Sequence, residues 1–425
     1  MTKKLTLTIL ALLTGLGTPR AQHLDLDRTL RVDYIFSGDA THQEVSVCEL
    51  TSLAGWAGRR HNLDRLPLKG NGQLTLADAR TGKVLYRHSF STLFQEWLNS
   101  EEATRTRKAF ENVFLLPMPT DSARLTVTLQ GNHGRLLTEY THTIRPGDIL
   151  LRPLDGRPTP PHRYLLRSGS PEACIDVAMV AEGYTEDEMD DFYAKAREAA
   201  EALFAHEPFR HLKDRFNVVA VAAPSPQSGV SIPGQGVWRQ TALGAQFDTF
   251  YSDRYLTTLN LRRLNDLLTG IPYEHIIILA NTDNYGGGGI YNSYTLSMTR
   301  HRHFRPVVVH EFGHSFAGLA DEYYYDDQYT AFYYPDTEPW EQNLTTLKDF
   351  PSKWADMLPQ GTPVPTPPDA AHTERIGVYE GGGYQSKGVY RAFQECRMKI
   401  NDWPEFCPVC RRAIERLVDF YAPRP

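Results

Sequence analysis

The clearest chemical pattern in this chain is a pair of histidines flanking a glutamate, in the segment His310-Glu-Phe-Gly-His314. Residues four positions apart on a helix lie about 40° apart around its axis, so both imidazoles project from one face and can bind one metal ion. Glu311 lies about 100° from His310, which directs its carboxylate toward a metal-bound water rather than the metal. We therefore predict that His310 and His314 bind zinc and that Glu311 is the catalytic base. The alternative is a pair of hydrogen-bonded core histidines, which would be costly to bury without a ligand.

The neighbouring residues predict the helix that this pattern requires. Pro306 suits the first helical turn, where its missing N–H costs nothing. Val307–Val309, Phe312 and Phe316 are apolar enough to bury the helix in a core. Gly318 can adopt a left-handed conformation, end the helix and return the chain toward the metal.

A carboxylate after this glycine is the expected third ligand, and two adjacent carboxylates compete for the role. Asp321 lies three residues after Gly318, and Glu322 follows it. Because successive residues of an extended segment point to opposite sides, only one of them is expected to bind the ion. The other would accept a hydrogen bond from a ligand histidine. The short side chain of Asp321 suits a chain already brought close, whereas Glu322 or a remote residue such as His372 are the alternatives.

Composition limits the class of protein. The chain has 425 residues, of which 41% are hydrophobic and 23% charged, as in globular proteins of two or three domains. Lys and Arg number 45 and Asp and Glu 51, a net charge of −6. No basic face for nucleic acid is expected from this balance, so we predict no nucleic-acid partner.

The N-terminus indicates export. Residues 1–21 resemble a signal peptide, with Lys3 and Lys4 before the apolar run Leu5–Leu16 and the small residue Ala21 at the end. An apolar run of about 12 residues is too short to span ~30 Å of hydrocarbon, and no other segment is long enough, so we predict no membrane span. The mature protein is expected to be secreted or periplasmic and to begin near Gln22.

Export changes the interpretation of the cysteines, which are Cys48, Cys174, Cys396, Cys407 and Cys410. In an oxidising compartment, the three near the C-terminus favour one local disulfide, from Cys396 to Cys407 or Cys410. The segment Cys407-Pro-Val-Cys410 could instead be half of a four-cysteine structural zinc site. Because Cys48 and Cys174 stand alone, the sequence offers no second half, and the disulfide is favoured.

The remaining pattern divides the chain into three parts and predicts an α+β protein. Residues 22–150 contain short alternating segments with Gly and Asn turns, which predict an antiparallel β-sandwich. Residues 151–171 are rich in proline and are the predicted linker. Residues 172–425 are the predicted catalytic domain, of mixed α/β pattern. There a capping box at Thr185-Glu-Asp-Glu188 opens a helix to about residue 204, and buried strands are expected at 175–181, 216–223 and 275–280.

Together these features resemble the metzincin metallopeptidases and, within them, the IgA-peptidase family, or igalysins. The resemblance rests on the segment His310–Tyr323, on Gly286–Gly289 followed by Ile290-Tyr-Asn292, on Cys396-Arg-Met398 followed by Phe406-Cys-Pro-Val-Cys410, and on the sandwich-like N-terminal domain. It implies a metzincin-like α/β zinc-peptidase domain with Zn²⁺ as cofactor. It also implies a protein or peptide substrate, such as immunoglobulin or other host glycoproteins.

One departure from the commoner metzincin pattern concerns the third ligand. Three residues rather than two separate His314 from Gly318, which puts Ala320 where the third histidine usually falls. The interval of three from Gly318 to Asp321 does match the usual arrangement, so the resemblance favours Asp321.

Two other segments have both a functional and a plain interpretation. The glycines of 286–289 permit close backbone approach, as an edge that pairs with an extended peptide requires, or they form a flexible loop. By resemblance, this segment would be the upper rim of the cleft. Residues 306–347 contain eight acidic residues and no Lys or Arg, which predicts a solvated acidic and aromatic loop or, alternatively, a calcium site.

We therefore expect a secreted zinc-dependent endopeptidase that hydrolyses peptide bonds of extracellular substrates by a zinc-bound water activated by Glu311. One alternative is a zinc exopeptidase or amidase that acts on cell-wall or glycoprotein peptides. Another is a non-catalytic surface adhesin with a structural zinc. Glu311 argues against the adhesin, because a structural zinc site does not need a base.

Overall fold

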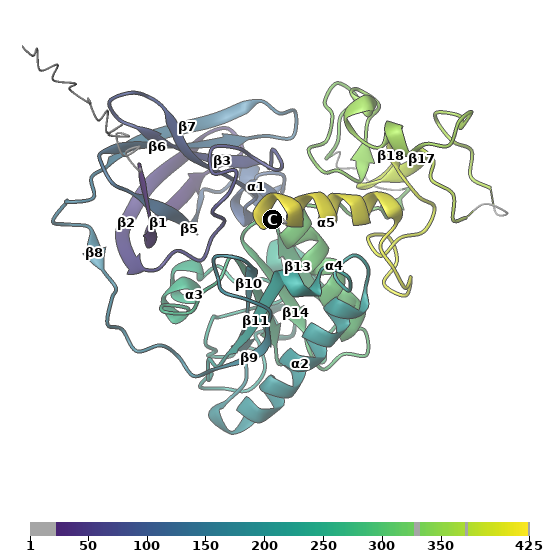
Figure 1. The fold of residues 1–425 in the computed structure, drawn as a ribbon. Coiled ribbons are helices and arrows are strands. Elements are labelled where there is room, and N and C mark those ends of the chain that lie inside the picture. The colour runs from purple at the N-terminus through teal and green to yellow at the C-terminus, as the bar shows by residue number, and fades with distance from the viewer. Residues whose placement is uncertain (1–22, 327–331, 370–372, 424–425) are drawn as a thin grey trace, which may run out of the picture.

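The computed structural model describes residues 23–326, 332–369 and 373–423, and the predicted signal peptide lies outside them. This part of the chain is mixed α+β, with four sheets and few helices (Figure 1). The N-terminal part is rich in β-structure, and the helices follow it. The predicted fold class is confirmed at this coarser level.

The first part of the chain forms two four-stranded sheets. One has the order β5-β1-β2-β8, with β1 at Leu24–Gly38, β2 at Gln43–Ala54, β5 at Lys108–Pro119 and β8 at Arg152–Pro153. The other has the order β4-β3-β6-β7, with β3 at Gly72–Asp78, β4 at Val84–Phe90, β6 at Ala123–Gln130 and β7 at Leu136–Ile144. All pairs except β2–β8 are antiparallel. Helix α1 spans Leu93–Trp97.

Aromatic side chains join these two sheets. Phe90 of β4 packs on Phe114 of β5 with ring centroids 4.4 Å apart, and on Phe36 of β1 at 6.2 Å. Tyr34 of β1 hydrogen-bonds to His142 of β7 at 2.6 Å. Hydrophobic residues of both sheets are therefore buried against one another.

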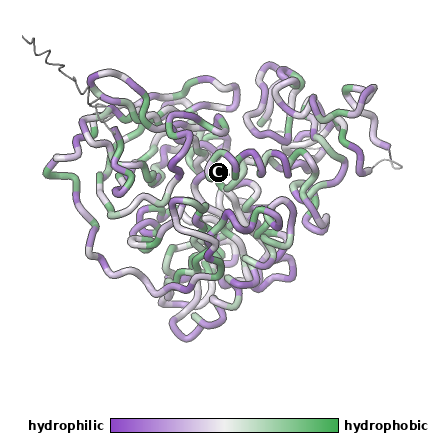
Figure 2. Tube along the Cα trace, viewed as in Figure 1, coloured by the Kyte–Doolittle hydropathy of each residue, from purple (hydrophilic) through white to green (hydrophobic). Residues whose placement is uncertain are grey.

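The second part is built on a six-stranded sheet of order β13-β14-β12-β10-β11-β9. Its strands are β9 (His162–Arg167), β10 (Ile175–Glu182), β11 (Phe216–Val221), β12 (His275–Ala280), β13 (Gly287–Ile290) and β14 (Tyr294–Met298). The four inner strands are parallel, whereas the edge strands β9 and β13 are antiparallel to their neighbours. Every residue of β10, β11 and β12 is buried, and Figure 2 shows hydrophobic residues along these central strands.

The described residues of this part form the helices α2 (Met189–Ala205), α3 (Leu261–Leu267), α4 (Phe304–Ala317) and α5 (Pro408–Tyr421). The predicted capping box at Thr185 and Glu188 is present, and it opens a 3-10 turn that leads into α2. Helix α4 packs on β13 and β14 and contacts α2 and α5. None of the described helices combines the length and the apolar character needed to cross a membrane.

A small sheet follows α4, with the order β15-β18-β16 and with β17 also paired to β18. Its strands are β15 (Tyr324–Tyr325), β16 (Leu344–Thr345), β17 (Tyr379–Gly382) and β18 (Tyr384–Arg391). Short 3-10 helices lie at Glu102–Thr104, Glu186–Glu188, Lys213–Arg215, Pro233–Gln235, Thr249–Tyr251, Phe350–Ser352 and Ala355–Met357.

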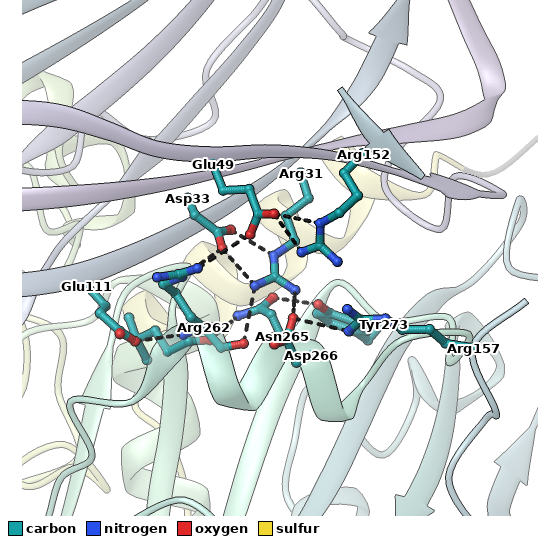
Figure 3. A network of polar contacts seen from close by, with 11 residues as sticks. Arg31, Asp33, Glu49, Glu111, Arg152, Arg157, Arg262, Asn265, Asp266 and Tyr273 are labelled. Atoms are coloured by element: carbon teal, nitrogen blue, oxygen red, sulfur yellow. Dashed lines mark hydrogen bonds and ion pairs between the residues drawn. The ribbon is translucent and has the colours of Figure 1, made fainter. Parts of the chain in front are cut away.

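A network of ion pairs joins the N-terminal sheet β5-β1-β2-β8 to α3 (Figure 3). Arg31 of β1 bridges Asp33 at 2.7 Å and Asp266 of α3 at 2.6 Å, and both Arg31 and Asp33 are buried. Arg262 of α3 reaches back to Asp33 at 3.1 Å and to Glu49 of β2 at 3.4 Å. Paired and hydrogen-bonded in this way, the buried charges hold the two parts in one orientation.

The predicted linker, residues 151–171, contains two strands. Strand β8 pairs with β2 of the first part, and β9 forms an edge of the central sheet. The chain therefore crosses from one part to the other between residues 153 and 162, while the domain boundaries themselves stay a prediction.

Candidate metal centre

Helix α4 carries the two histidines on one face. Their ring centroids are 4.7 Å apart, and the two Nε2 atoms are 3.0 Å apart. Gly313 between them leaves room for Met398, because a Cβ there would lie 2.9 Å from the Met398 Sδ. The loop that contains Met398 can therefore pack directly against the helix at the histidine pair.

Gly318 ends the helix as the sequence predicts. Its φ of +57° is left-handed, and its N–H donates to the carbonyl of His314 at 2.9 Å. The chain then returns to the histidines, so that Asp321 Oδ1 lies 3.0 Å from His310 Nε2 and 3.3 Å from His314 Nε2. One ligand atom from each of the three residues lies within 4.8 Å of the others.

The second nitrogen of each ring has a backbone partner. His310 Nδ1 donates to the carbonyl of Arg397 at 3.0 Å, and His314 Nδ1 donates to the carbonyl of Leu319 at 2.6 Å. A carbonyl can only accept, so each Nδ1 carries a proton, and each Nε2 faces Asp321 and offers its lone pair to a metal once it has released any proton of its own. Two lone pairs and a carboxylate that converge on one point form the donor set of a cation site.

The pKa values show that this point favours positive charge. Burial lowers the pKa of His314, but Asp321 and Glu311 outweigh it and raise that pKa to about 9. Burial likewise opposes a charged Asp321, yet His314 and His310 hold the pKa of its carboxyl well below its usual range. The residues present thus fit a bound metal cation on their own chemistry.

Glu311 lies beside this cluster and against the glycine run. Burial raises the pKa of its carboxyl, and His310 and His314 partly offset the rise. A Cβ on Gly287 would lie 3.0 Å from Glu311 Oε1, and one on Gly289 would lie 2.2 Å from the Glu311 carbonyl oxygen. Only glycine lets β13 approach α4 this closely, which gives the run a packing role beside the site.

The cluster lies on a large cleft of about 1120 Å³. His310, Glu311, His314 and Asp321 all line it, as do the glycines of β13. The N-terminal part supplies another portion of the wall, from Asn71, Gln95, Glu96, Asn99 and Asn132. The sequence showed no chemistry in the N-terminal part, and its contribution to the cleft was missed.

Two hydroxyl–carboxylate contacts in this cleft also have no local signal in the sequence. Tyr384, at the start of β18, donates its hydroxyl hydrogen bond to Asp321 Oδ2. Tyr255 donates to Glu96 Oε2, while burial raises the pKa of the Glu96 carboxyl to about 7. In each pair, the tyrosine and the carboxylate lie far apart in the chain, so only the fold brings them together.

The other carboxylate, Glu322, does not face the histidines. Its Oε1 accepts hydrogen bonds from Asn343 Nδ2 at 3.0 Å and from the Cys410 thiol at 3.2 Å. The predicted role of Glu322 as acceptor for a ligand histidine is therefore wrong, because the carbonyls of Arg397 and Leu319 hold those two Nδ1 atoms. The remaining alternative, His372, lies outside the described residues.

The cysteines require a further correction. Cys396, Cys407 and Cys410 converge as expected, but all five cysteines are free thiols, and the sulfurs of Cys396 and Cys410 are 3.8 Å apart. A disulfide needs about 2.05 Å, so the predicted local bridge is absent. The spacing of the cysteines in the sequence predicts a disulfide, but it cannot show that Glu322 lies in the same cluster.

The acidic residues that follow Glu322 show individual partners where the structure describes them, rather than a shared calcium site. Glu338 lies 3.8 Å from Lys353, and Glu341 accepts from the Tyr333 hydroxyl at 3.1 Å. Within the described residues, the groups that could hold a metal include neither of these carboxylates nor Asp326. Asp327 lies outside the residues that the structure describes.

Comparison with known protein families gives two matches. A family model described as IgA Peptidase M64 matches residues 164–375 and 368–418, and one described as Peptidase M64 N-terminus matches residues 22–141. The matched ranges include both the histidine cluster and the N-terminal wall of the cleft. No curated protein matches the chain.

Proposed function

Because the chain belongs to the IgA peptidase M64 family, we propose that it is a secreted or periplasmic zinc-dependent endopeptidase. The family makes it a peptidase, and the resemblance found in the sequence is confirmed. The observation that carries the finer proposal is the convergence of His310 Nε2, His314 Nε2 and Asp321 Oδ1 on the cleft, with Glu311 beside them.

In this proposal, His310, His314 and Asp321 hold the metal. Zinc, when bound, would supply a Lewis acid that polarises the scissile carbonyl and acidifies an attacking water. The carbonyls of Arg397 and Leu319 keep both rings in the tautomer that leaves Nε2 free, and Tyr384 orients Asp321 through its second oxygen.

Glu311 would be the general base. Its carboxylate takes a proton from the attacking water and then gives it to the leaving amine. Burial raises its pKa toward the range in which a carboxylate both accepts and returns a proton, although its two histidine neighbours oppose the rise.

The substrate is proposed to be an extended segment of an extracellular protein. Strand β13 is an edge strand of the central sheet and lines the cleft beside Glu311. Tyr255 already bridges this edge at Gly287, and an extended peptide could add to the remainder of the edge through main-chain hydrogen bonds, with its carbonyl directed at the metal cluster. Immunoglobulin A and other host glycoproteins are the substrates to test first, because the family description names the former.

We also propose the finer fold assignment. The aromatic contacts between the two N-terminal sheets support a β-sandwich over residues 22–150. The packing of Met398 against Gly313, below the histidine helix, supports a metzincin-like domain over residues 172–425.

The test is metal analysis beside cleavage of a peptide library. Glu311→Ala removes a base but no ligand, so we expect it to keep its metal and to lose about 10²- to 10⁴-fold in kcat. His310→Ala and His314→Ala should lose metal and hydrolysis together. Exposed Glu186→Ala is the matched control and should cleave at the wild-type rate. Wild-type cleavage by Glu311→Ala would refute Glu311 as the base, whereas a wild type that binds metal without cleaving any peptide would refute the peptidase and leave the adhesin.

A further inference from the structure

A second cluster of metal-ligating side chains lies outside the cleft. Glu322, Cys396, Cys407 and Cys410 are all buried, and one ligand atom from each lies within 4.8 Å of the others. They come from three segments: the loop after α4, the loop of Met398 and the start of α5. We propose that these four side chains form a second, closed metal site that binds a thiophilic divalent cation such as Zn²⁺.

The spacing of the sulfurs agrees with metal ligands. Two sulfurs bound to one tetrahedral zinc at ~2.3 Å lie about 3.8 Å apart. The sulfurs of Cys396 and Cys410 are 3.8 Å apart, and Cys410 Sγ lies 3.2 Å from Glu322 Oε1. The backbone N–H of Cys407 donates to Cys396 Sγ at 3.2 Å, so that sulfur already accepts a hydrogen bond that suits a thiolate.

Glu322 provides an independent sign that a ligand is needed. Its side chain is 0% exposed, and its Oε2 has no hydrogen-bond partner among the described residues. Oε1 is held by Asn343, which also exchanges two hydrogen bonds with the backbone of Ala320 and so fixes this loop. A buried carboxylate oxygen without a partner is costly, and a cation within the cluster would remove that cost.

The donor set selects the class of cation. Three thiols and one carboxylate suit zinc and other thiophilic ions, whereas calcium and magnesium require oxygen ligands. Cys407 caps α5, and Cys410 lies in its first turn, where the helix N-terminus stabilises thiolates. Arg391 and Arg397 are also buried and act electrostatically on Glu322 and Cys396, which limits the excess negative charge.

The cluster is connected to the first one by three consecutive residues. Cys396 belongs to the second cluster, the carbonyl of Arg397 holds His310 Nδ1, and the carbonyl of Met398 accepts from the Glu322 N–H at 2.8 Å. An ion in the second site would therefore fix both the loop that bears Asp321 and the loop behind His310. Its role would be to position the ligands of the open cluster, and its existence does not depend on the peptidase activity.

The test counts metal in the full-length protein after loading with zinc alone. We expect two equivalents for the wild type, and one each for His310→Ala/His314→Ala and for Cys407→Ser/Cys410→Ser. Exposed Cys48→Ser is the matched control and should keep two. Loading with cobalt alone identifies the site, since the near-ultraviolet sulfur-to-cobalt band should persist in the histidine variant and vanish in the cysteine variant.

The wild type supplies a second measurement in case the cysteine variant does not fold. Thiols are counted in denaturant with chelator and without reductant, and five are expected. A disulfide between any two of Cys396, Cys407 and Cys410 would overturn the proposal, as would a histidine variant without the cobalt–sulfur band. An inactive wild type that still shows this band would refute only the peptidase.

Discussion

Asp321 and Glu322 are adjacent in the chain, but their carboxylates belong to clusters with different access to solvent. Asp321 joins two histidines on the wall of the cleft, whereas Glu322 joins three cysteines, none of which lines the cleft. Successive side chains of an extended segment point in opposite directions, so one short loop serves both clusters. The open cluster has three donor side chains with the Glu311 carboxylate beside it, and the closed cluster has four donor side chains.

In the two proposals, this difference separates a catalytic metal site from a structural one. A catalytic zinc keeps one position for water or substrate, whereas a structural zinc is enclosed by four protein ligands. The partners behind the ligands differ in the same way. Backbone carbonyls and Tyr384 orient the open cluster, and Asn343 fixes the closed one.

The largest expected contrast is in zinc affinity, between two variants that each replace one of these carboxylates with alanine. Asp321→Ala should weaken zinc binding at the histidine cluster by more than about 100-fold, since the loss of a partner behind a ligand already costs 10–100-fold. Glu322→Ala should change that affinity far less, because its carboxylate faces the cysteines. Competition with a chelator in a background of Cys407→Ser/Cys410→Ser measures the histidine site alone. Equal losses for the two variants would show that the clusters are not separate.

A smaller effect is expected from the tyrosine behind Asp321. Tyr384→Phe removes only the hydroxyl that donates to Asp321 Oδ2, and it should lower zinc affinity at the open cluster by about 10- to 100-fold. Tyr390→Phe, on the same strand, is the matched control and should bind zinc as the wild type does. The same competition assay applies. An unchanged affinity in Tyr384→Phe would mean that helix α4 and the loop after Gly318 orient Asp321 without help from β18.

The parts of the site that the sequence predicted are those with local spacing. The histidine pair depends on a separation of four residues in one helix, and Gly318 and Asp321 follow within seven residues of His314. Helical periodicity and the glycine turn are sufficient to bring them together. The same reasoning predicted the capping box before α2, which the structure contains.

The parts that could not be predicted depend on long-range contacts. The Arg397 carbonyl that holds His310 lies 87 residues away, and Cys410 lies 88 residues from Glu322. No sequence periodicity links such pairs. The three cysteines alone therefore predict a disulfide, and nothing in the sequence indicates that Glu322 joins them. The N-terminal wall of the cleft was missed for the same reason, since Glu96 has no neighbour in sequence that indicates a site.

The smallest expected effect concerns a histidine that is buried but belongs to neither metal-ligand cluster. His275, at the start of β12, is 4% exposed, its ring lies 4.8 Å from that of Phe316, and its Nε2 has no hydrogen-bond partner among the described residues. Burial lowers its pKa to about 3, from 6.5. His314 is partly buried, but the carboxylates of Asp321 and Glu311 beside it raise its pKa instead. The contrast indicates that a neighbouring carboxylate raises the pKa of a histidine, whereas burial alone lowers it.

The depressed pKa of His275 has a consequence for stability in acid. Below pH 6.5 the unfolded chain takes up a proton that the folded chain does not accept until about pH 3, so the contribution to stability is complete above pH 6.5 and falls as the pH falls toward 3. Between pH 7 and 5.5, the wild type should lose about 1 kcal/mol more free energy of unfolding than His275→Phe does. Urea unfolding at both values measures the difference, and exposed His61→Phe should follow the wild type. Equal pH dependence in the wild type and His275→Phe would show that water or a local opening reaches this ring beneath α4.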